Sequence, residues 1–254
     1  MSSTSSIPVR ILGLIPARYA STRFPGKPLI DIHGKSMIQR VYEQASKSAT
    51  LSEVAVATDD ERIREHVEGF GGKVIMTANT HQSGTDRCAE AARHLPGFDV
   101  IINIQGDEPY IDARQIDLLG DCFSNQETEL ATLVKIVSSN EELHNVNSPK
   151  VILNRHSEAL YFSRTPIPYL RDKSPDSWLS AHTFYKHIGV YGYRADILEA
   201  ITKLPVSLLE KAESLEQLRW LENGYKIKVA VTDIETRAID TPEDLKTVLK
   251  ENKS

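Results

Sequence analysis

Residues 100–109 carry the sequence VIINIQGDEP, and this stretch decides the fold class. Its first six residues form an apolar run that suits a strand inside a sheet, and the run ends at a glycine and two carboxylates. Similar runs at 10–16, 53–58 and 73–77 alternate with amphipathic segments that begin near Ser36, Glu61 and Gly84. This alternation predicts an α/β protein with a doubly wound, mostly parallel, Rossmann-like sheet that helices cover on both faces.

The pattern changes after Pro149, where strand-like runs are no longer separated by long helical segments. The elements expected there are strands at 151–153, 158–163 and 186–194, a loop at 166–180, helices from Ala195 and over 207–222, a strand at 226–231 and a helix after Pro242. We therefore predict one α/β domain over 10–254, with a first half at 10–135 and a smaller mixed β/α part at 136–254. Residues 1–9 are expected to be a disordered extension.

Composition excludes several classes of protein. With 254 residues, 40% of them hydrophobic and 26% charged, the chain is neither disordered nor collagenous. Its net charge of −5 argues against a nucleic-acid partner. Two cysteines, Cys88 and Cys122, encode neither a disulfide framework nor a zinc cluster, and no apolar run approaches the roughly 18 residues of a membrane span. We expect a cytoplasmic protein without a membrane anchor.

The loop at 16–28 is rich in cations and hydroxyls. It holds Arg18, Arg23 and Lys27, while Asp31 is the only acidic residue among the first 35. Ligands of such sheets bind outside the carboxyl ends of the strands, so this loop suits a polyphosphate, although a solvated basic loop is equally compatible with the charges. The Gly34-Lys35-Ser36 triplet is not a P-loop, because Leu29 stands where the earlier glycine is required.

Two aspartates follow strand-like runs and are candidate metal ligands. Asp107 emerges at the ligand edge of the sheet, and Asp240 occupies a similar place before Pro242. Carboxylates that face a basic phosphate loop suit Mg²⁺, which binds hard oxygen ligands together with phosphate oxygens. Helix capping is the alternative interpretation of both positions.

Seven segments together resemble the 3-deoxy-manno-octulosonate (Kdo) cytidylyltransferases. They lie at 16–28, 81–87, 105–109, 159–164, 187–194, 215–219 and 240–244, in the order of that family. The resemblance implies a fold like that of the nucleotide-diphospho-sugar transferases and transfer of CMP from CTP to the anomeric hydroxyl of Kdo. It also implies release of pyrophosphate, a requirement for Mg²⁺, a role in lipopolysaccharide biosynthesis and a homodimer formed by the second part, near 161–168.

The same resemblance assigns roles to individual residues. Catalytic roles fall to Arg18, Lys27, Asp107 and Asp240, of which the two aspartates would also hold the metal. Nucleotide contacts fall to Pro16, Ala17, Arg18, Ser21, Thr22, Lys27, Gln82, Ser83, Arg87, Gln105 and Asp107. Sugar contacts fall to Gln105, Arg164, Tyr185, His187, Tyr191, Glu216 and Gln217. From the residues alone, His187 would be a core histidine, Arg164 part of an ion pair, and Glu216 and Gln217 part of a solvated helix face.

Three other functions remain open. A cytidylyltransferase for 8-amino-Kdo shares most of these motifs, whereas the sialic acid synthetases resemble the chain less at the loop 16–28. A glycosyltransferase usually carries an Asp-x-Asp motif, whereas this chain has Gly106-Asp107-Glu108-Pro109. A non-catalytic nucleotide-sugar binding module would keep the fold without needing both Asp107 and Asp240.

Overall fold

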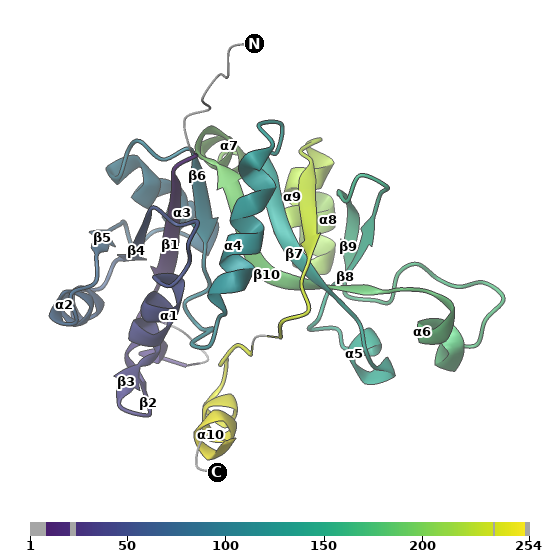
Figure 1. Cartoon of the computed structure of the whole chain (residues 1–254), viewed down its shortest axis with the longest axis horizontal. Coiled ribbons are helices and arrows are strands. Elements are labelled where there is room, and N and C mark those ends of the chain that lie inside the picture. Colours follow the sequence, from purple (N-terminus) through teal and green to yellow (C-terminus); the bar gives the residue numbers. More distant parts are fainter. Residues whose placement is uncertain (1–8, 21–23, 236, 252–254) are drawn as a thin grey trace.

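The computed structural model describes residues 9–20, 24–235 and 237–251. Within these ranges nine strands form one mixed sheet, whose main path runs β11-β7-β10-β6-β1-β4-β5 (Figure 1). The strands are β1 (Ile11–Ala17), β4 (Glu53–Thr58), β5 (Val74–Met76), β6 (Val100–Asn103), β7 (Leu130–Ile136), β8 (Lys150–Leu153), β9 (Ala159–Ser163), β10 (Tyr185–Arg194) and β11 (Ile227–Val231), with a separate hairpin of β2 (Asp31–Ile32) and β3 (Lys35–Ser36). Along the main path every strand runs in one direction except β10, which is antiparallel to β6 and β7.

Helices connect the strands. The α-helices are α1 (Met37–Ala45), α2 (Glu61–Gly69), α3 (Gly84–His94), α4 (Ala113–Asp121), α5 (Asn140–His144), α6 (Trp178–Ala181), α7 (Ala195–Ile201), α8 (Leu208–Glu213), α9 (Gln217–Glu222) and α10 (Pro242–Glu251). Short 3₁₀ turns are η1 (Lys27–Leu29), η2 (Cys122–Ser124) and η3 (Pro175–Ser177). None of the helices in the described part of the chain combines the length and apolarity needed to cross a bilayer.

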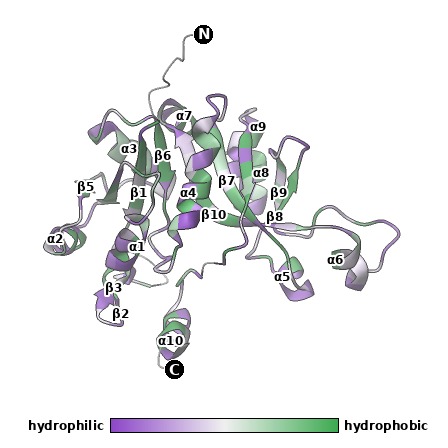
Figure 2. Cartoon of the chain, viewed as in Figure 1, coloured by the Kyte–Doolittle hydropathy of each residue, from purple (hydrophilic) through white to green (hydrophobic). Residues whose placement is uncertain are grey.

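The sheet separates two hydrophobic layers, as the alternation of side chains along β1 shows. Leu12 and Leu14 belong to the layer under α3, α7 and α9, whereas Ile11 and Ile15 belong to the layer under α1, α2 and α4. The central strands are the most apolar part of the ribbon in Figure 2. The prediction of a doubly wound, mostly parallel α/β sheet is confirmed.

Most predicted elements are present, but the single helix expected over 207–222 is wrong. The segment forms α8 and α9, separated by Ser214 in the left-handed region with φ of 51°. Arg164 donates hydrogen bonds to the carbonyls of Glu213 and Ser214, at 2.6 and 3.1 Å, and so satisfies the end of α8. The predicted loop at 166–180 also contains η3 and part of α6.

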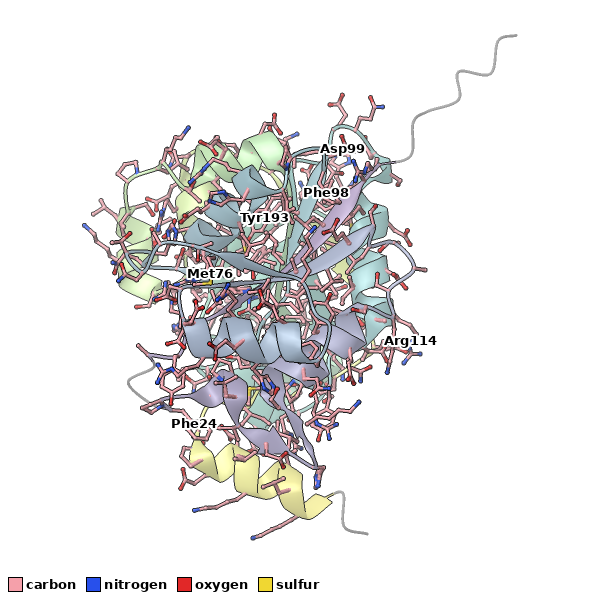
Figure 3. All side chains as sticks on the ribbon, turned by 90° about the vertical axis from the view of Figure 1, so that its left-hand side faces the viewer. Phe24, Met76, Phe98, Asp99, Arg114 and Tyr193 are labelled. Atoms are coloured by element: carbon pink, nitrogen blue, oxygen red, sulfur yellow. The ribbon has the colours of Figure 1, made fainter. Side chains whose placement is uncertain are left out.

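The end of the chain forms a separate small unit. After β11 an extended segment leads to α10, which packs with the β2–β3 hairpin in a satellite core of Ile32, Met37, Ile239 and Val248. Phe24 packs against this core, and Figure 3 shows it beside α10. The extension predicted at 1–9 lies outside the described residues apart from Val9, which packs on the α1 side of the sheet.

Candidate active site

Three loops meet at Pro16, near the carboxyl end of β1. A Cβ added at Gly106, after β6, would lie 2.8 Å from the Pro16 carbonyl oxygen. A Cβ added at Gly84, the first residue of α3, would lie 3.2 Å from Pro16 Cγ. Glycine at these positions therefore lets the loops after β1 and β6 and the start of α3 pack together, as the ligand edge of the sheet requires.

Lys27 and the two predicted metal ligands converge at this edge. Lys27 Nζ lies 2.8 Å from Asp107 Oδ2 and 3.2 Å from Asp240 Oδ1. The amide of Ile239 donates to the Asp107 carbonyl at 2.9 Å, which fixes the extended segment beside the loop after β6. Gly26, with φ of 72°, supplies the left-handed turn that starts η1 at Lys27.

This arrangement fits a divalent cation. Asp107 and Asp240 share one cation already, the Lys27 ammonium, so their oxygens are close enough to act together. No three His, Cys, Asp or Glu side chains cluster for a metal within 9–20, 24–235 and 237–251. Mg²⁺ commonly uses one or two carboxylates and takes its other ligands from water and substrate phosphates, so two aspartates beside the basic loop after β1 are a suitable set.

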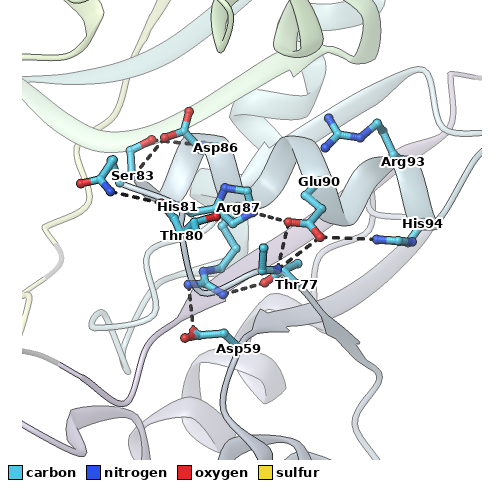
Figure 4. Close-up of polar contacts among 12 residues, drawn as sticks. Asp59, Thr77, Thr80, His81, Ser83, Asp86, Arg87, Glu90, Arg93 and His94 are labelled. Atoms are coloured by element: carbon cyan, nitrogen blue, oxygen red, sulfur yellow. Dashed lines mark hydrogen bonds and ion pairs between the residues drawn. The ribbon is translucent and has the colours of Figure 1, made fainter.

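Arg18 links the loop after β1 to the loop before α3. Its guanidinium donates to the His81 carbonyl and lies 3.4 Å from the Ser83 carbonyl. Ser83 and Asp86 form a capping box at the start of α3 (Figure 4). Gln82 is exposed, and its side-chain amide donates to Thr80. The predicted contacts Ser21 and Thr22, and Arg23 beside them, lie outside the described residues.

Arg87 lies behind the loop at 77–83. It has no exposed surface, pairs with Asp59 at 2.8 Å and donates to Thr77 at 2.6 Å (Figure 4). These contacts tie α3 to the ends of β4 and β5, so the guanidinium supports the loop and does not face the opening. Sequence reasoning missed Asp59 and Thr77, since only the fold brings the strand ends to α3.

Four of the predicted sugar contacts gather on β10 and beside α9. His187 and Tyr191 lie on β10 with ring centroids 5.1 Å apart, and Glu216 and Gln217 begin the α9 segment. The register of β10 against β7 shifts between Ile188 and Tyr191, and the Thr132 hydroxyl donates to the Val190 carbonyl at 2.7 Å within this bulge. The bulge brings His187 and Tyr191 together.

Burial shifts the pKa of two of these groups. Burial lowers the pKa of His187 to about 3, so the imidazole is neutral at pH 7, and its Nε2 lies 2.9 Å from the Thr132 hydroxyl. Burial also raises the pKa of Glu216, against the hydrogen bond that Thr85 donates to it at 2.7 Å. Thr85 and Thr132 were not singled out from the sequence.

Several polar atoms at this place are buried without a hydrogen bond of ordinary geometry. They are Asn103 Oδ1, the hydroxyls of Tyr191 and Tyr193, and Gln217 Nε2. Asn103 pairs with Tyr191 across β6 and β10, and Tyr191 and Tyr193 both contact Trp220 beside Gln217. Tyr193, labelled in Figure 3, has no exposed surface. Buried polar groups usually have a partner, so the polar cluster of Asn103, Tyr191, Tyr193 and Gln217 is a candidate place for water or a polar ligand.

The remaining predicted contacts differ in their hydrogen bonding and exposure. Besides its bonds to the turn before α9, Arg164 donates to the Val146 carbonyl at 2.9 Å. Tyr185 is partly exposed at the start of β10, and Gln105 is partly exposed between β6 and Asp107. Pro16 and Ala17 end β1. Asn103 is a further site residue that sequence reasoning missed, although an amide in the most apolar strand was a visible signal.

Comparisons with known proteins agree on one family. The sequence profile described as "Cytidylyltransferase" matches residues 12–227. A relative from Parabacteroides distasonis is 59% identical over 95% of this chain and 97% of its own length, and one from Bacteroides thetaiotaomicron is 58% identical over 94% and 96%. Both are named 3-deoxy-manno-octulosonate cytidylyltransferase.

Solved structures extend this similarity to three dimensions. A CMP:2-keto-3-deoxy-manno-octonic acid synthetase complexed with CTP superposes with a TM-score of 0.89 at 44% identity, covering 96% of this chain and 98% of that one. A 4-diphosphocytidyl-2C-methyl-D-erythritol synthase from Anaerococcus prevotii has a TM-score of 0.62 at 13% identity, covering 98% of this chain and all of its own, and shares the fold.

Proposed function

The chain belongs to the cytidylyltransferase family, and from this membership we infer that it transfers CMP from CTP to the anomeric hydroxyl of Kdo. It is then a nucleotidyltransferase that releases pyrophosphate and makes CMP-Kdo, an activated sugar for lipopolysaccharide biosynthesis. The observation that carries this proposal is the 59% identity, over 95% of the chain, to a relative named for this activity. The similarity to a synthetase complexed with CTP supports the nucleotide.

The phosphates of CTP are proposed to lie along the loop after β1. The anomeric oxygen attacks the α-phosphorus, and the bond between the α-phosphorus and the bridging oxygen breaks. Arg18 and Lys27 stabilise the negative charge that grows on the departing pyrophosphate. Both cations are already gathered at this edge, Arg18 against the 81–83 loop and Lys27 between Asp107 and Asp240.

Asp107 and Asp240 are proposed to hold Mg²⁺. When bound, the ion supplies charge neutralisation at the phosphates and lowers the pKa of a hydroxyl near it. The chain's own part is to bring the two carboxylates together, which it does through the Gly106 loop and the Ile239–Asp107 hydrogen bond. Mg²⁺ would then neutralise the two aspartates in place of the Lys27 ammonium, so Lys27 would be available to the phosphates.

Kdo is proposed to bind at the polar cluster on β10 and beside α9. Neutral His187 and the amide of Gln217 offer a polyol both donors and acceptors, and Glu216 accepts from hydroxyls. Arg164 brings a positive charge to the turn that precedes Glu216, where it complements a sugar carboxylate. Gln105 and Tyr185, both partly exposed, are further proposed sugar contacts.

We further propose a cytoplasmic homodimer formed by the second part, near 161–168. Leu160 and Tyr169, which flank this range, are 58% and 74% exposed, as a subunit contact would require. Cys88 and Cys122 are both free, which suits a reducing compartment. Light scattering that gives the mass of a monomer at micromolar concentration would refute the dimer.

Pyrophosphate release tests the activity directly. Purified protein with CTP and Mg²⁺ is compared with Kdo, 8-amino-Kdo, sialic acid and no sugar. Rapid release with Kdo alone is expected, and Asp107→Asn should reduce it by about 100-fold or more, because the variant removes one of the two carboxylates proposed to hold Mg²⁺. Asp121→Asn, a change at an exposed aspartate of α4, is the matched control and should act like the wild type.

The other outcomes are decisive as well. Release with 8-amino-Kdo or sialic acid in place of Kdo would keep the reaction and reassign the sugar. If the protein binds CTP but releases no pyrophosphate with any of the three sugars, it is a binding module and the proposed enzyme activity is refuted.

A further inference from the structure

The hydrogen bond between Thr85 and Glu216 joins two elements that are distant in sequence. Thr85 Oγ1 lies 2.7 Å from Glu216 Oε2, although 131 residues separate them in the chain. Thr85 is the second residue of α3, directly after the capped start that contacts Pro16. Glu216 stands at the start of α9. The contact therefore connects the nucleotide side of the site with the sugar side.

Glu216 has no structural duty on its own helix. It occupies the position before α9 but makes no side-chain cap there. Its neighbour Arg219, which could neutralise it, is engaged by both carboxylate oxygens of Glu210 at 2.7 and 2.6 Å. Asp86, beside Thr85, is used in the capping box of α3. Ser83 also contributes a side-chain hydrogen bond to Glu216 but is held in the cap of α3, so the Thr85 hydroxyl, at 2.7 Å, is the donor that sets the orientation of the Glu216 carboxylate.

Thr85 is well suited to this task. Only 4% of its surface is exposed, and a β-branched side chain on a helix has few rotamers, so the hydroxyl has a fixed direction. A carboxylate in a largely buried place needs donors to remain ionised and ordered. The Tyr193 hydroxyl lies close to Thr85 and Asn103, and this hydroxyl and Asn103 Oδ1 are buried without a hydrogen bond of ordinary geometry. Several buried polar side chains therefore surround the Thr85–Glu216 hydrogen bond.

We propose that Thr85 is a positioning residue that holds Glu216 toward the sugar and couples sugar binding to the nucleotide helix α3. This inference rests on the proposed function, because it takes Glu216 as a Kdo contact. Thr85 itself touches no substrate in this account. Its effect should therefore fall on Kdo and leave the affinity for CTP alone unchanged.

The test compares Thr85→Val, which replaces the hydroxyl by a methyl group, with Thr85→Ser, which keeps it. Thr85→Val should lower kcat/KM for Kdo by about tenfold or more, the loss expected for a hydrogen bond to a charged group. The Kd for CTP, measured by calorimetry without sugar, should stay within about twofold of the wild type, and Thr85→Ser should restore most of the activity. Thr128→Val, another buried threonine, with no side-chain hydrogen bond among the described contacts, is the matched control.

A double-mutant cycle separates positioning from general damage. If Thr85 acts through Glu216, Thr85→Val added to Glu216→Gln should cost no more than about twofold beyond Glu216→Gln alone. Fully additive losses, an equal rise in the Kd for CTP, or failure of Thr85→Ser to rescue would each overturn the inference. If the wild type prefers another acidic sugar, the same comparison is made with that sugar. A wild type that is silent with every sugar refutes the proposed function, and this inference with it.

Discussion

Lys27 neutralises part of the negative charge of the two aspartates at the site. Its ammonium pairs with Asp107 and Asp240, and we expect it to serve the phosphates once CTP is bound. Lys27→Met should lower kcat/KM for CTP by about 100-fold or more, as loss of one preorganised charge at the reacting phosphate does. Lys35→Met, which removes an exposed lysine paired with Glu43, is the control. Equal pyrophosphate-release kinetics for both variants would contradict the role of Lys27.

His187 gives stability a pH dependence of known sign. Its pKa falls from an ordinary 6.5 to about 3 in the folded protein, so below pH 6.5 the unfolded chain takes up a proton that the native chain refuses. The free energy of unfolding should therefore decrease as the pH is lowered from about 6.5 to 3, by at most about 1.4 kcal/mol per pH unit from this group. His187→Gln should flatten that part of the curve. Urea unfolding at several pH values measures it, and parallel curves would contradict the prediction.

For single residues, the sequence predicted where a side chain lies in the fold better than which side chain it contacts. Asp107 could be placed at the ligand edge because a buried strand ends just before it. The burial of Arg87 could not be foreseen, because its partner Asp59 follows a different strand and the two meet only when β4 and α3 pack. The same is true of Thr85, whose partner Glu216 lies in the second part of the chain. The segment 81–87, which contains Thr85, was recognised as a motif, but no local sequence pattern indicates the contact between Thr85 and Glu216.

Among the elements, α10 has the most direct consequence for the site. It packs on the satellite core through Val248, and the segment that leads into it carries Ile239 and Asp240. Val248→Asp should detach α10 and lower activity by about tenfold or more, since burying an unpaired charge costs several kcal/mol. The sheet should remain folded, because its own two cores are separate from this one.

The control for this variant lies on the same helix. Thr247→Asp introduces the same charge at an exposed position next to Val248. Circular dichroism should show the sheet intact in both variants, while the Mg²⁺ concentration needed for half-maximal rate should rise only in Val248→Asp. Unchanged metal dependence in that variant would show that α10 does not deliver Asp240.

Element prediction succeeded where a strand or helix has its own periodicity. The runs at 53–58 and 100–105 match β4 and β6, because apolar and β-branched residues fill them. No segment corresponding to β7 or α4 was predicted, although β7 lies between β11 and β10 in the sheet and α4 packs against β7 and β10. The break at Ser214 was missed for another reason: the leucines of α8 and α9 keep helical spacing across it, and the turn depends on Arg164 from a distant strand.

At the scale of the whole molecule, the two parts of the chain share one sheet. Strand β10 lies between β6 and β7, so residues from the second part complete the sheet of the first. Residues 10–135 and 136–254, produced as separate fragments, should therefore each lack cooperative unfolding, and mixing them at micromolar concentration should restore little CTP binding. Urea titration followed by circular dichroism tests this. A fragment 10–135 that unfolds cooperatively and binds CTP would contradict it.

The strand order also has a consequence for synthesis on the ribosome. As the chain emerges, β6 is complete long before β10, so one edge of an apolar strand waits without its neighbour while the intervening residues are translated. At 5–20 residues per second this wait lasts several seconds, and an open strand edge is a template for aggregation. A nascent chain stalled before Tyr185 should thus be a strong client of chaperones, and release beyond Arg194 should end that dependence.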